Sequence, residues 1–314
     1  MVAAFIRLIR PLNLIMILFT QYMVRFAFLY PVYKAVGFSL QLNEMVFFMF
    51  SMAFVFMAAG GYIINDYCDM AIDKVNKPLK VIIGNTISVN MALTAYWVLS
   101  GIGITIGVWA SYKAGLPSLG LLFFIYLSGL WFYSNTLKYV FLLGNIVIAL
   151  FLALVPFTAG LIELYADLKT TLFNTTDIDF GYILSWITGI SVFAFFSTLA
   201  REIIKDMEDI EGDTQAGCRT IPIVLGVPDT KRVVQFVLLL IFFLSGFLQY
   251  NQAKGGDWIS FSYFLIFIQI PVLFILRQTS RASVSSDFHK VSFALKLLMV
   301  SGISYLFVFA YTIH

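Results

Sequence analysis

Residues 45–73 read MVFFMFSMAFVFMAAGGYIINDYCDMAID, an apolar run that passes directly into a series of polar side chains. The apolar part, residues 45–64, is long enough to cross the roughly 30 Å hydrocarbon core of a bilayer as a helix. Beyond it, Asn65, Asp69 and Asp73 are spaced four residues apart, so a continuing helix would carry all three on one face. The stretch therefore predicts a membrane span that ends in a row of oxygen ligands.

The whole chain has the composition of a membrane protein. Of its 314 residues, 61% are hydrophobic and only 12% are charged, which lies outside the usual range for soluble domains. Apolar runs of about 20 residues, the length of a spanning helix, occur nine times. They lie near residues 12–30, 45–64, 89–109, 118–137, 139–162, 181–200, 233–250, 258–276 and 291–312. We therefore predict an all-α integral membrane protein with nine transmembrane helices and the lipid bilayer as its main partner.

The loop charges predict the orientation of these spans. With the N-terminus inside, 14 Lys and Arg residues fall in inner loops and 4 in outer loops, while Arg25 and Lys296 lie within spans. Because inner loops carry the excess of positive charge, we expect a multi-pass protein with a cytoplasmic N-terminus. Nine spans then place the C-terminus on the opposite side. The net charge of +3 is small and dispersed, so nucleic acid is not an expected partner.

A second acidic segment repeats the first. Asp206, Asp209 and Asp213 each lie 140 residues after an aspartate of the first segment, and their spacing again stacks them on one helical face. Both segments directly follow a span and fall on the predicted cytoplasmic side. We interpret residues 1–314 as a single domain. Two repeated halves, about 1–140 and 141–314, would place the acidic segments around a shared cavity, although the match is also short enough to arise without duplication.

Stacked carboxylates repel one another, and a bound cation would offset that repulsion. Oxygen ligands without a neighbouring His or Cys favour a hard ion such as Mg²⁺, which commonly bridges carboxylates to phosphate oxygens. The alternative is that both rows are only solvated, charged loop faces. Two rows with matching offsets favour the first interpretation, which predicts a phosphorylated ligand. The predicted metal ligands are Asn65, Asp69, Asp73, Asp206, Asp209 and Asp213.

The chain resembles the UbiA superfamily of intramembrane prenyltransferases. Residues 65–73 match its Asn-x-x-x-Asp-x-x-x-Asp motif, and residues 209–213 match its Asp-x-x-x-Asp motif. Further similar features are Arg10-Pro11-x-Asn13, Asn76-Lys77-Pro78, Tyr133-Ser134 with Lys138, and Gly217-Cys218-Arg219-Thr220-x-Pro222. Residues 201–213 look most similar to the branch that transfers geranylgeranyl groups to geranylgeranylglycerol phosphate.

The resemblance implies both a fold and an activity. The fold would be a helical bundle around a central cavity, with a cytoplasmic polar cap. The activity would be Mg²⁺-dependent transfer of a prenyl group from a prenyl diphosphate, here geranylgeranyl diphosphate, to a membrane-embedded acceptor. In the most similar branch the acceptor is geranylgeranylglyceryl phosphate and the product is an ether lipid of phospholipid biosynthesis.

The resemblance also implies residue roles. The six metal ligands and Lys138 would form the catalytic centre, where Mg²⁺ is held against the diphosphate and its C–O bond breaks. The residues expected to contact substrate are Asn13, Lys77, Tyr133, Lys138, Lys205 and Arg219. The Asn13 amide is expected beside the allylic cation. Lys205, or Arg201 outside this set, would bind an acceptor phosphate, and the alternative for both is a cytosolic anchor at a helix end.

Two other functions remain open at this point. An aromatic prenyltransferase of quinone biosynthesis would use the same ionisation with an aromatic acceptor. A transporter or binding protein for a cation or a phosphorylated lipid would move or hold its ligand without consuming prenyl diphosphate. Transporters commonly place polar groups near the bilayer midplane, whereas the acids here gather at one surface. That distribution favours the enzyme.

Overall fold

The computed structural model describes residues 1–76, 78–170 and 179–313. Within these residues, nine helices are long and apolar enough to span a membrane, as predicted. The single-element spans are α4 (Glu44–Cys68), α6 (Val89–Lys113), α8 (Leu143–Thr170), α9 (Phe180–Glu208), α12 (Val227–Lys254) and α15 (Ser285–Thr312). No strand occurs among the described residues, so the predicted all-α class is confirmed.

Three spans are built from more than one helical segment. The first joins α2 (Pro11–Tyr22), η1 (Met23–Leu29) and α3 (Tyr30–Ala35); the fourth joins η3 (Pro117–Leu119) and α7 (Gly120–Asn135); the eighth joins α13 (Trp258–Phe264), η6 (Leu265–Gln269) and α14 (Ile270–Arg281). Both η1 and η6 are π-helical, and each ends shortly before a proline, Pro31 or Pro271. A proline ring clashes with the carbonyl four residues back, and the wider π-turn accommodates that clash.

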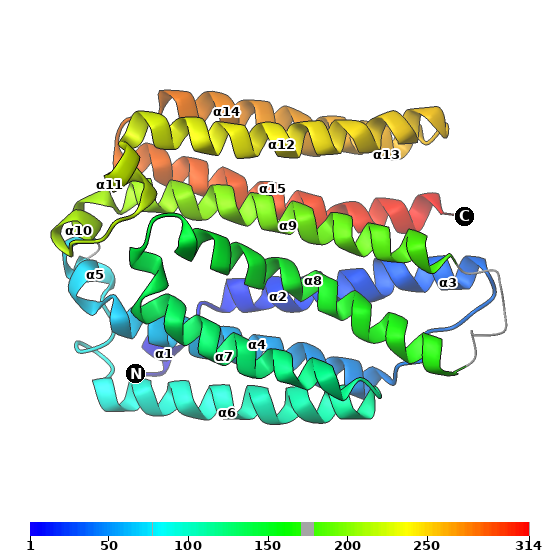
Figure 1. Ribbon diagram of the computed structural model, residues 1–314, viewed down its shortest axis with the longest axis horizontal. Coiled ribbons are helices and arrows are strands. Elements are labelled where there is room, and N and C mark those ends of the chain that lie inside the picture. Colours follow the sequence, from blue (N-terminus) through cyan, green and yellow to red (C-terminus); the bar gives the residue numbers. More distant parts are fainter. Residues whose placement is uncertain (77, 171–178, 314) are drawn as a thin grey trace.

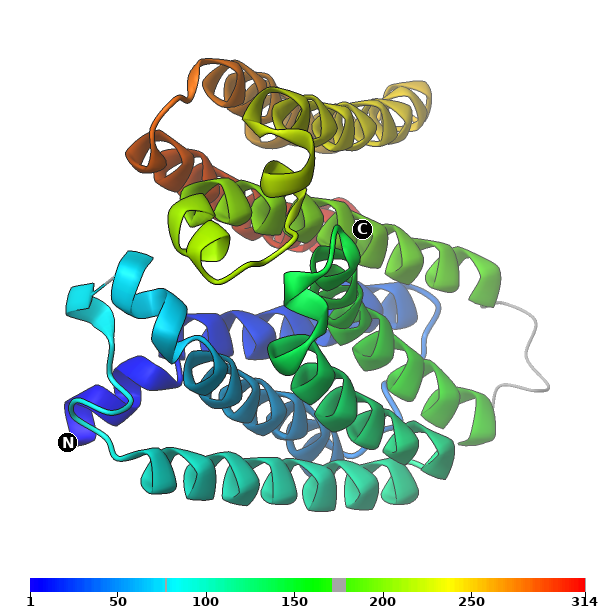
Figure 2. The same ribbon diagram turned by 60° about the vertical axis from the view of Figure 1, so that its left-hand side comes forward.

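The short helices gather at one end of the bundle. They are α1 (Val2–Leu8), α5 (Met70–Asn76), η2 (Pro78–Lys80), η4 (Leu137–Tyr139), α10 (Ile210–Gln215) and α11 (Ile221–Leu225). The N-terminus lies at this end and the C-terminus at the other (Figure 1). Figure 2 brings this end forward and shows α5 beside α10. We call it the cap end.

The spans pack in two groups. In the first half of the chain α4 packs on α6 and α7, and in the second α9 packs on α12 and α15, while α8 joins the groups by packing on α9. Lipid is as apolar as the side chains, so close packing rather than burial must hold such helices together. Gly107 shows how this works: a Cβ at that position would lie 2.5 Å from the Phe123 ring. Only glycine lets α6 approach α7 this closely.

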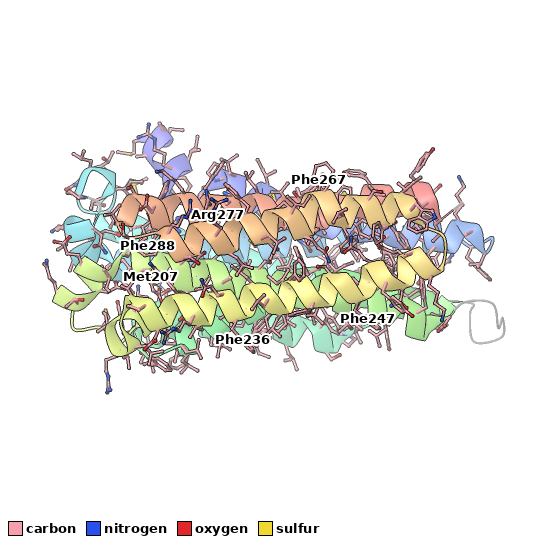
Figure 3. The ribbon with its side chains drawn as sticks, turned by 90° about the horizontal axis from the view of Figure 1, so that it is seen from above. Met207, Phe236, Phe247, Phe267, Arg277 and Phe288 are labelled. Atoms are coloured by element: carbon pink, nitrogen blue, oxygen red, sulfur yellow. The ribbon has the colours of Figure 1, made fainter. Side chains whose placement is uncertain are left out.

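Large apolar side chains also cover the outer surface. Phe236 on α12 is 62% exposed, and Phe267 on η6 is 46% exposed. Figure 3 shows these rings along the outside of the bundle. Rings this exposed would be unfavourable in water and are expected where the surroundings are lipid.

The structure corrects three boundary predictions. First, α4 and α9 continue past residues 64 and 200 to Cys68 and Glu208, so the acidic rows begin on the last helical turns of the spans themselves. Second, the fifth span begins at Leu143 rather than at residue 139, because η4 and a left-handed Leu142 (φ 60°) occupy the connection. Third, Glu163 lies inside the fifth span and forms a buried ion pair with Arg25 at 3.5 Å.

Candidate active site

The first acidic row lies where α4 gives way to α5. Asp69 is the residue between the two helices, and the bonds from Asp69 N to Asn65 O (2.9 Å) and from Asp73 N to Asp69 O (2.8 Å) keep the backbone helical. Lys138 donates to Asp69 Oδ1 at 2.6 Å and to Asn65 Oδ1 at 3.4 Å. Two of the predicted ligands therefore point their oxygens at one cationic position, which the Lys138 ammonium fills.

The second row has the same construction. Asp209 lies between α9 and α10, and its N–H bonds to Lys205 O at 2.9 Å while Asp213 N bonds back to Asp209 O at 3.2 Å. One turn earlier, Asp206 accepts a hydrogen bond from Asn145 Nδ2 at 2.8 Å. The 140-residue offset seen in the sequence thus relates two helix breaks as well as two sets of acids.

Asn76 joins the two rows directly. Its Nδ2 donates to Asp209 O at 3.1 Å, and its Oδ1 accepts from Gly212 N at 2.8 Å. A Cβ at Gly212 would lie 2.5 Å from the Asn76 side chain, so only glycine permits this contact without displacing Asn76. The contact fixes α5 against α10 and holds the two acidic helix ends together.

Aromatic and thiol groups lie between the rows. Tyr133 is within electrostatic reach of Asp69 and Asp206, one acid from each row. Burial, together with the charge of Asp213, raises the pKa of the Cys218 thiol to about 11. Burial likewise raises the pKa of the Tyr139 hydroxyl, with Asp69 adding to the effect. Both groups keep their protons at neutral pH, so the anionic ligands available between the rows are carboxylates.

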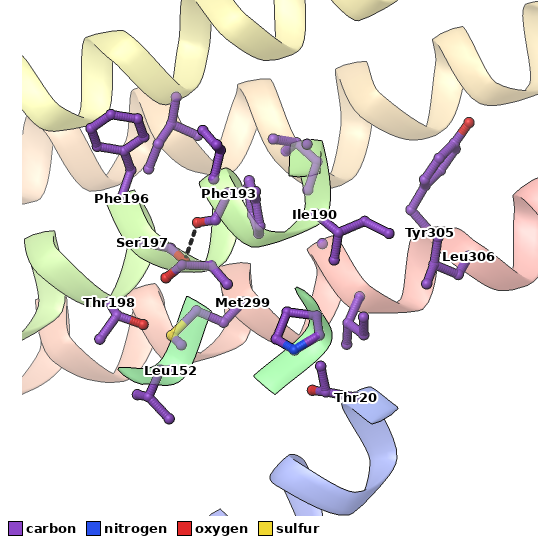
Figure 4. A pocket seen from close by; sticks show the side chains of 18 of the residues that line it. Thr20, Leu152, Ile190, Phe193, Phe196, Ser197, Thr198, Met299, Tyr305 and Leu306 are labelled. Carbon is purple, nitrogen blue, oxygen red and sulfur yellow. Dashed lines mark hydrogen bonds between the residues drawn. The ribbon is translucent and has the colours of Figure 1, made fainter. Parts of the chain in front are cut away.

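A cavity of about 750 Å³ lies inside the bundle. It is lined by residues of α2, α4, α8, α9, α12, α13, η6 and α15, and aromatic and aliphatic side chains form most of its wall (Figure 4). Its aromatic residues are Tyr62, Tyr182, Trp186, Phe193, Phe196, Phe247, Phe264 and Tyr305. Its charged lining residues lie on the cap-end halves of α9 and α15, and we call this part of the wall, with the polar residues beside it, the mouth. The mouth residues are Asn13, Tyr62, Thr198, Arg201 and Lys296.

Ion pairs connect the mouth to the rows. Arg10 pairs with Asp66 at 2.5 Å and lies 4.9 Å from the centroid of the Tyr62 ring. Glu202 is buried and pairs with Arg201 at 2.7 Å and with Lys205 at 3.4 Å. These pairs lie within one or two helical turns of Asn65 and Asp206. The mouth and the acidic rows are therefore adjacent along α4 and α9, although none of the six predicted metal ligands is itself a lining residue of the cavity.

The donor set suits Mg²⁺. Among the described residues, no group of three His, Cys, Asp or Glu side chains converges closely enough to form a metal centre unaided. Mg²⁺ does not require one, since it keeps several waters and usually takes one or two carboxylates together with phosphate oxygens. The convergence of Asn65 and Asp69 on the Lys138 ammonium shows that this site favours a positive charge.

The structure brings together most of the predicted site residues. Asn65, Asp69 and Lys138 are in contact, Asp206 lies across from them beside Tyr133, and Asp73, Asp209 and Asp213 lie on the adjoining turns. Arg219 has an exposed side chain, and its N–H donates to Tyr139 O at 2.8 Å. Lys205 is paired with Glu202. Lys77 falls outside the described residues.

Several neighbours of the site carried no predicted role. They are Arg10, Tyr62, Asn76, Asn145 and Lys296. Arg10 and Asn76 belong to stretches quoted for the resemblance, but nothing in the sequence shows which acid or backbone group each one contacts. Lys296 could have been singled out, because it is the one Lys or Arg in the apolar run 291–312.

Comparison with known proteins identifies relatives of the chain. The model of the UbiA prenyltransferase family matches residues 26–300. A digeranylgeranylglyceryl phosphate synthase of Sulfolobus acidocaldarius is 31% identical over 228 residues, which make up 72% of this chain and 75% of the relative.

Solved structures share the fold. One described as digeranylgeranylglyceryl phosphate synthase in membranes has a TM-score of 0.60 at 21% identity, covering 98% of both chains. A UbiA homologue from Archaeoglobus fulgidus bound to GPP and Mg²⁺ has a TM-score of 0.54 at 16% identity, covering 97% of this chain and 99% of that one.

Proposed function

The chain belongs to the UbiA prenyltransferase family, and from this premise we propose that it transfers a geranylgeranyl group from geranylgeranyl diphosphate to geranylgeranylglyceryl phosphate. The observation that carries the proposal is the meeting of two acidic helix ends next to the charged part of a largely apolar cavity. Such a site suits a ligand with a diphosphate head and an isoprenoid tail. The acceptor is supported by the relative from Sulfolobus acidocaldarius, which is named for that synthesis.

The acidic rows would hold Mg²⁺ against the diphosphate through Asn65, Asp69, Asp73, Asp206, Asp209 and Asp213. When bound, the ion would neutralise the negative charge that grows on the diphosphate as its bond to the allylic carbon breaks. Lys138 lies among these ligands and can donate to the same leaving oxygens, an interaction that strengthens as the bond breaks. Arg219 and Lys77 are further candidates for this role, and Tyr133 is a neutral donor between the rows.

The cavity would protect the cation that forms. Its apolar wall excludes water, and ring faces such as those of Trp186, Phe193 and Phe196 stabilise positive charge without forming a bond to it. The acceptor hydroxyl oxygen then bonds to the allylic carbon and loses its proton, which gives an ether and inorganic diphosphate. Asn13 is less suited to contact the cation than the resemblance implies, because its Oδ1 already accepts from Lys296 at 2.9 Å.

We also propose that the cap end faces the cytoplasm and that the chain consists of two related halves, about 1–140 and 141–314. The bias of 14 positive residues to 4 in the predicted loops supports the orientation. The matching helix breaks at Asp69 and Asp209 support the repeat.

A panel of acceptors tests the proposed reaction. Purified protein with Mg²⁺ and geranylgeranyl diphosphate is offered geranylgeranylglyceryl phosphate, 4-hydroxybenzoate or a naphthoate, and the products are identified by mass spectrometry. We expect an ether only from geranylgeranylglyceryl phosphate. A product from an aromatic acceptor alone would contradict the proposed acceptor while leaving prenyl transfer intact.

A further inference from the structure

The mouth of the cavity carries positive charge that no carboxylate on its wall balances. Among the described residues that line the cavity, the charged ones are Arg201 and Lys296. Lys296 Nζ donates to Asn13 Oδ1, a neutral group, at 2.9 Å. Arg201 pairs with Glu202, but Glu202 lies outside the cavity lining and also serves Lys205. The mouth therefore has a surplus of positive charge.

Two buried polar atoms of residues that line the same cavity as Lys296 lack partners. Arg201 Nε and Thr198 Oγ1 make no hydrogen bond within the described part of the chain. They are three residues apart on α9, and both belong to the cavity lining. Arg201 is within electrostatic reach of Lys296, and Figure 4 draws Thr198 and Met299, the latter about one turn beyond Lys296 on α15, as lining residues of the same cavity. Leaving buried polar atoms unpaired is unfavourable, so this arrangement is suited to a ligand that supplies acceptor oxygens.

We propose that Lys296, Arg201 and Thr198 form a second anion subsite that binds the phosphate of the acceptor lipid. This inference rests on the proposed function and adds to it the residues that recognise the acceptor. A phosphate monoester carries a charge of about −1.5 to −2 near neutral pH and three acceptor oxygens. It can therefore satisfy an ammonium, the free guanidinium N–H and a hydroxyl together.

The reaction requires such a subsite close to the diphosphate. In the acceptor, the phosphate and the attacking hydroxyl belong to the same glycerol unit, so the phosphate must lie within a few bond lengths of the allylic carbon. Arg201 precedes Asp206 by five residues on α9, which corresponds to about 7.5 Å along the helix axis. Two anions bound in neighbouring subsites repel one another unless each has its own cations. The acidic rows would serve the donor diphosphate through Mg²⁺, while Lys296 and Arg201 would serve the acceptor.

A binding experiment isolates the subsite from the metal. In Mg²⁺-free buffer the acidic rows repel phosphate, so only the mouth should attract it. Quenching of tryptophan fluorescence reports binding because Trp186 lines the cavity, and the probes are dodecyl phosphate and dodecanol. We expect the wild type to prefer dodecyl phosphate and Lys296→Gln to bind it roughly 10-fold more weakly or worse. Lys296→Arg should retain most of the preference, because it keeps the charge.

The matched control is Lys290→Gln, which removes a positive charge from an exposed position on the same helix. It should bind both probes as the wild type does. Should Lys296→Gln fold poorly, Thr198→Val removes only a hydroxyl and should still weaken dodecyl phosphate binding. Unchanged preference for the phosphate in Lys296→Gln, or in Thr198→Val when that variant is needed, would overturn the subsite.

The KM values of the two substrates distinguish acceptor binding from donor binding. Lys296→Gln should raise KM for geranylgeranylglyceryl phosphate by roughly 10-fold or more and leave KM for geranylgeranyl diphosphate unchanged. A rise in KM for the diphosphate instead would assign Lys296 to the donor and overturn the inference. If the wild type made no product from geranylgeranylglyceryl phosphate, the proposed function would fail, and the binding experiment would still decide whether the mouth is an anion subsite.

Discussion

Single side chains at the site act by placing charge where the diphosphate must lie. Lys138 contacts both Asn65 and Asp69, so one ammonium holds the first row in place and is positioned for the leaving group. The contact also explains how acids can accumulate at the end of a span. A neighbouring cation offsets part of their repulsion, and the remaining negative charge attracts a divalent ion.

A buried ion pair far from the cap end has a structural role. The side chains of Arg25 and Glu163 are 3% and 0% exposed and lie 3.5 Å apart, and Arg25 Nη2 also donates to Leu42 O at 2.7 Å. Removing one member of a buried pair strands the other charge at a cost of about 3–5 kcal/mol. We therefore expect Glu163→Leu to lower the denaturation midpoint in detergent strongly, and the double variant Arg25→Met/Glu163→Leu to recover most of that loss.

An exposed ion pair on α12 serves as the comparison for Arg25 and Glu163. Arg232 and Asp229 lie 2.6 Å apart with side chains 79% and 53% exposed, and such surface pairs contribute little. Arg232→Met should leave the midpoint almost unchanged. If Glu163→Leu lowered the denaturation midpoint as little as Arg232→Met does, the Arg25–Glu163 pair would not stabilise the bundle.

At the scale of elements, the sequence predicts what depends on local pattern. Nine apolar runs become nine spans, and the acids at four-residue and three-residue spacings lie on helical turns, because periodicity and length are properties of short stretches. The π-turns η1 and η6 were missed, since nearly uniform apolar sequence hides the change in helical period. Pro31 and Pro271 were the available signals.

Contacts between distant elements were beyond sequence reasoning. Nothing in the sequence pairs Asn76 with Gly212 or Asn13 with Lys296, which are separated by 136 and 283 residues. The start of α8 was misplaced for a related reason. η4 and the left-handed Leu142 form the connection that precedes α8. A distant loop contacts this connection through Arg219, whose N–H donates to Tyr139 O.

The contact between α5 and α10 gives a prediction at this scale. Gly212→Ala would place a Cβ 2.5 Å from the Asn76 side chain, so Asn76 must move and release Asp209 O and Gly212 N. Overpacking of this kind typically costs about 1–3 kcal/mol. We expect a lower denaturation midpoint and slower release of diphosphate, because the two acidic rows are no longer held together.

Gly101→Ala is the matched control, since it lies within α6, outside the cavity lining, and an added Cβ there meets nothing within 4 Å. It should behave as the wild type in both measurements. Wild-type turnover in Gly212→Ala would show that the Asn76 contact does not position the rows.

For the whole molecule, the bundle separates two environments. The cap end holds the acidic rows with the mouth just inside it, and the rest of the cavity is a largely apolar space suited to an isoprenoid chain. The exposed rings on α12 and η6 face the surrounding lipid, from which a membrane-embedded acceptor would come.

The orientation of the bundle can be measured directly. The termini lie at opposite ends of the molecule, and the positive-inside rule predicts that the N-terminus is cytoplasmic. In a bacterial inner membrane, a phosphatase fused after residue 314 should be active in the periplasm, whereas the same enzyme fused before residue 1 should be inactive. The reverse pattern would place the cap end outside and contradict the proposed orientation.

The central claim is that two acidic helix ends act together on one diphosphate, and the most direct test is diphosphate release. Wild-type protein with geranylgeranyl diphosphate and geranylgeranylglyceryl phosphate should release diphosphate only when Mg²⁺ is present. Asp69→Asn and Asp209→Asn should each slow release by about 100-fold or more, while Asp229→Asn, at an exposed acid on α12, should not. Release near the wild-type rate in either row variant, or release independent of Mg²⁺, would contradict the account.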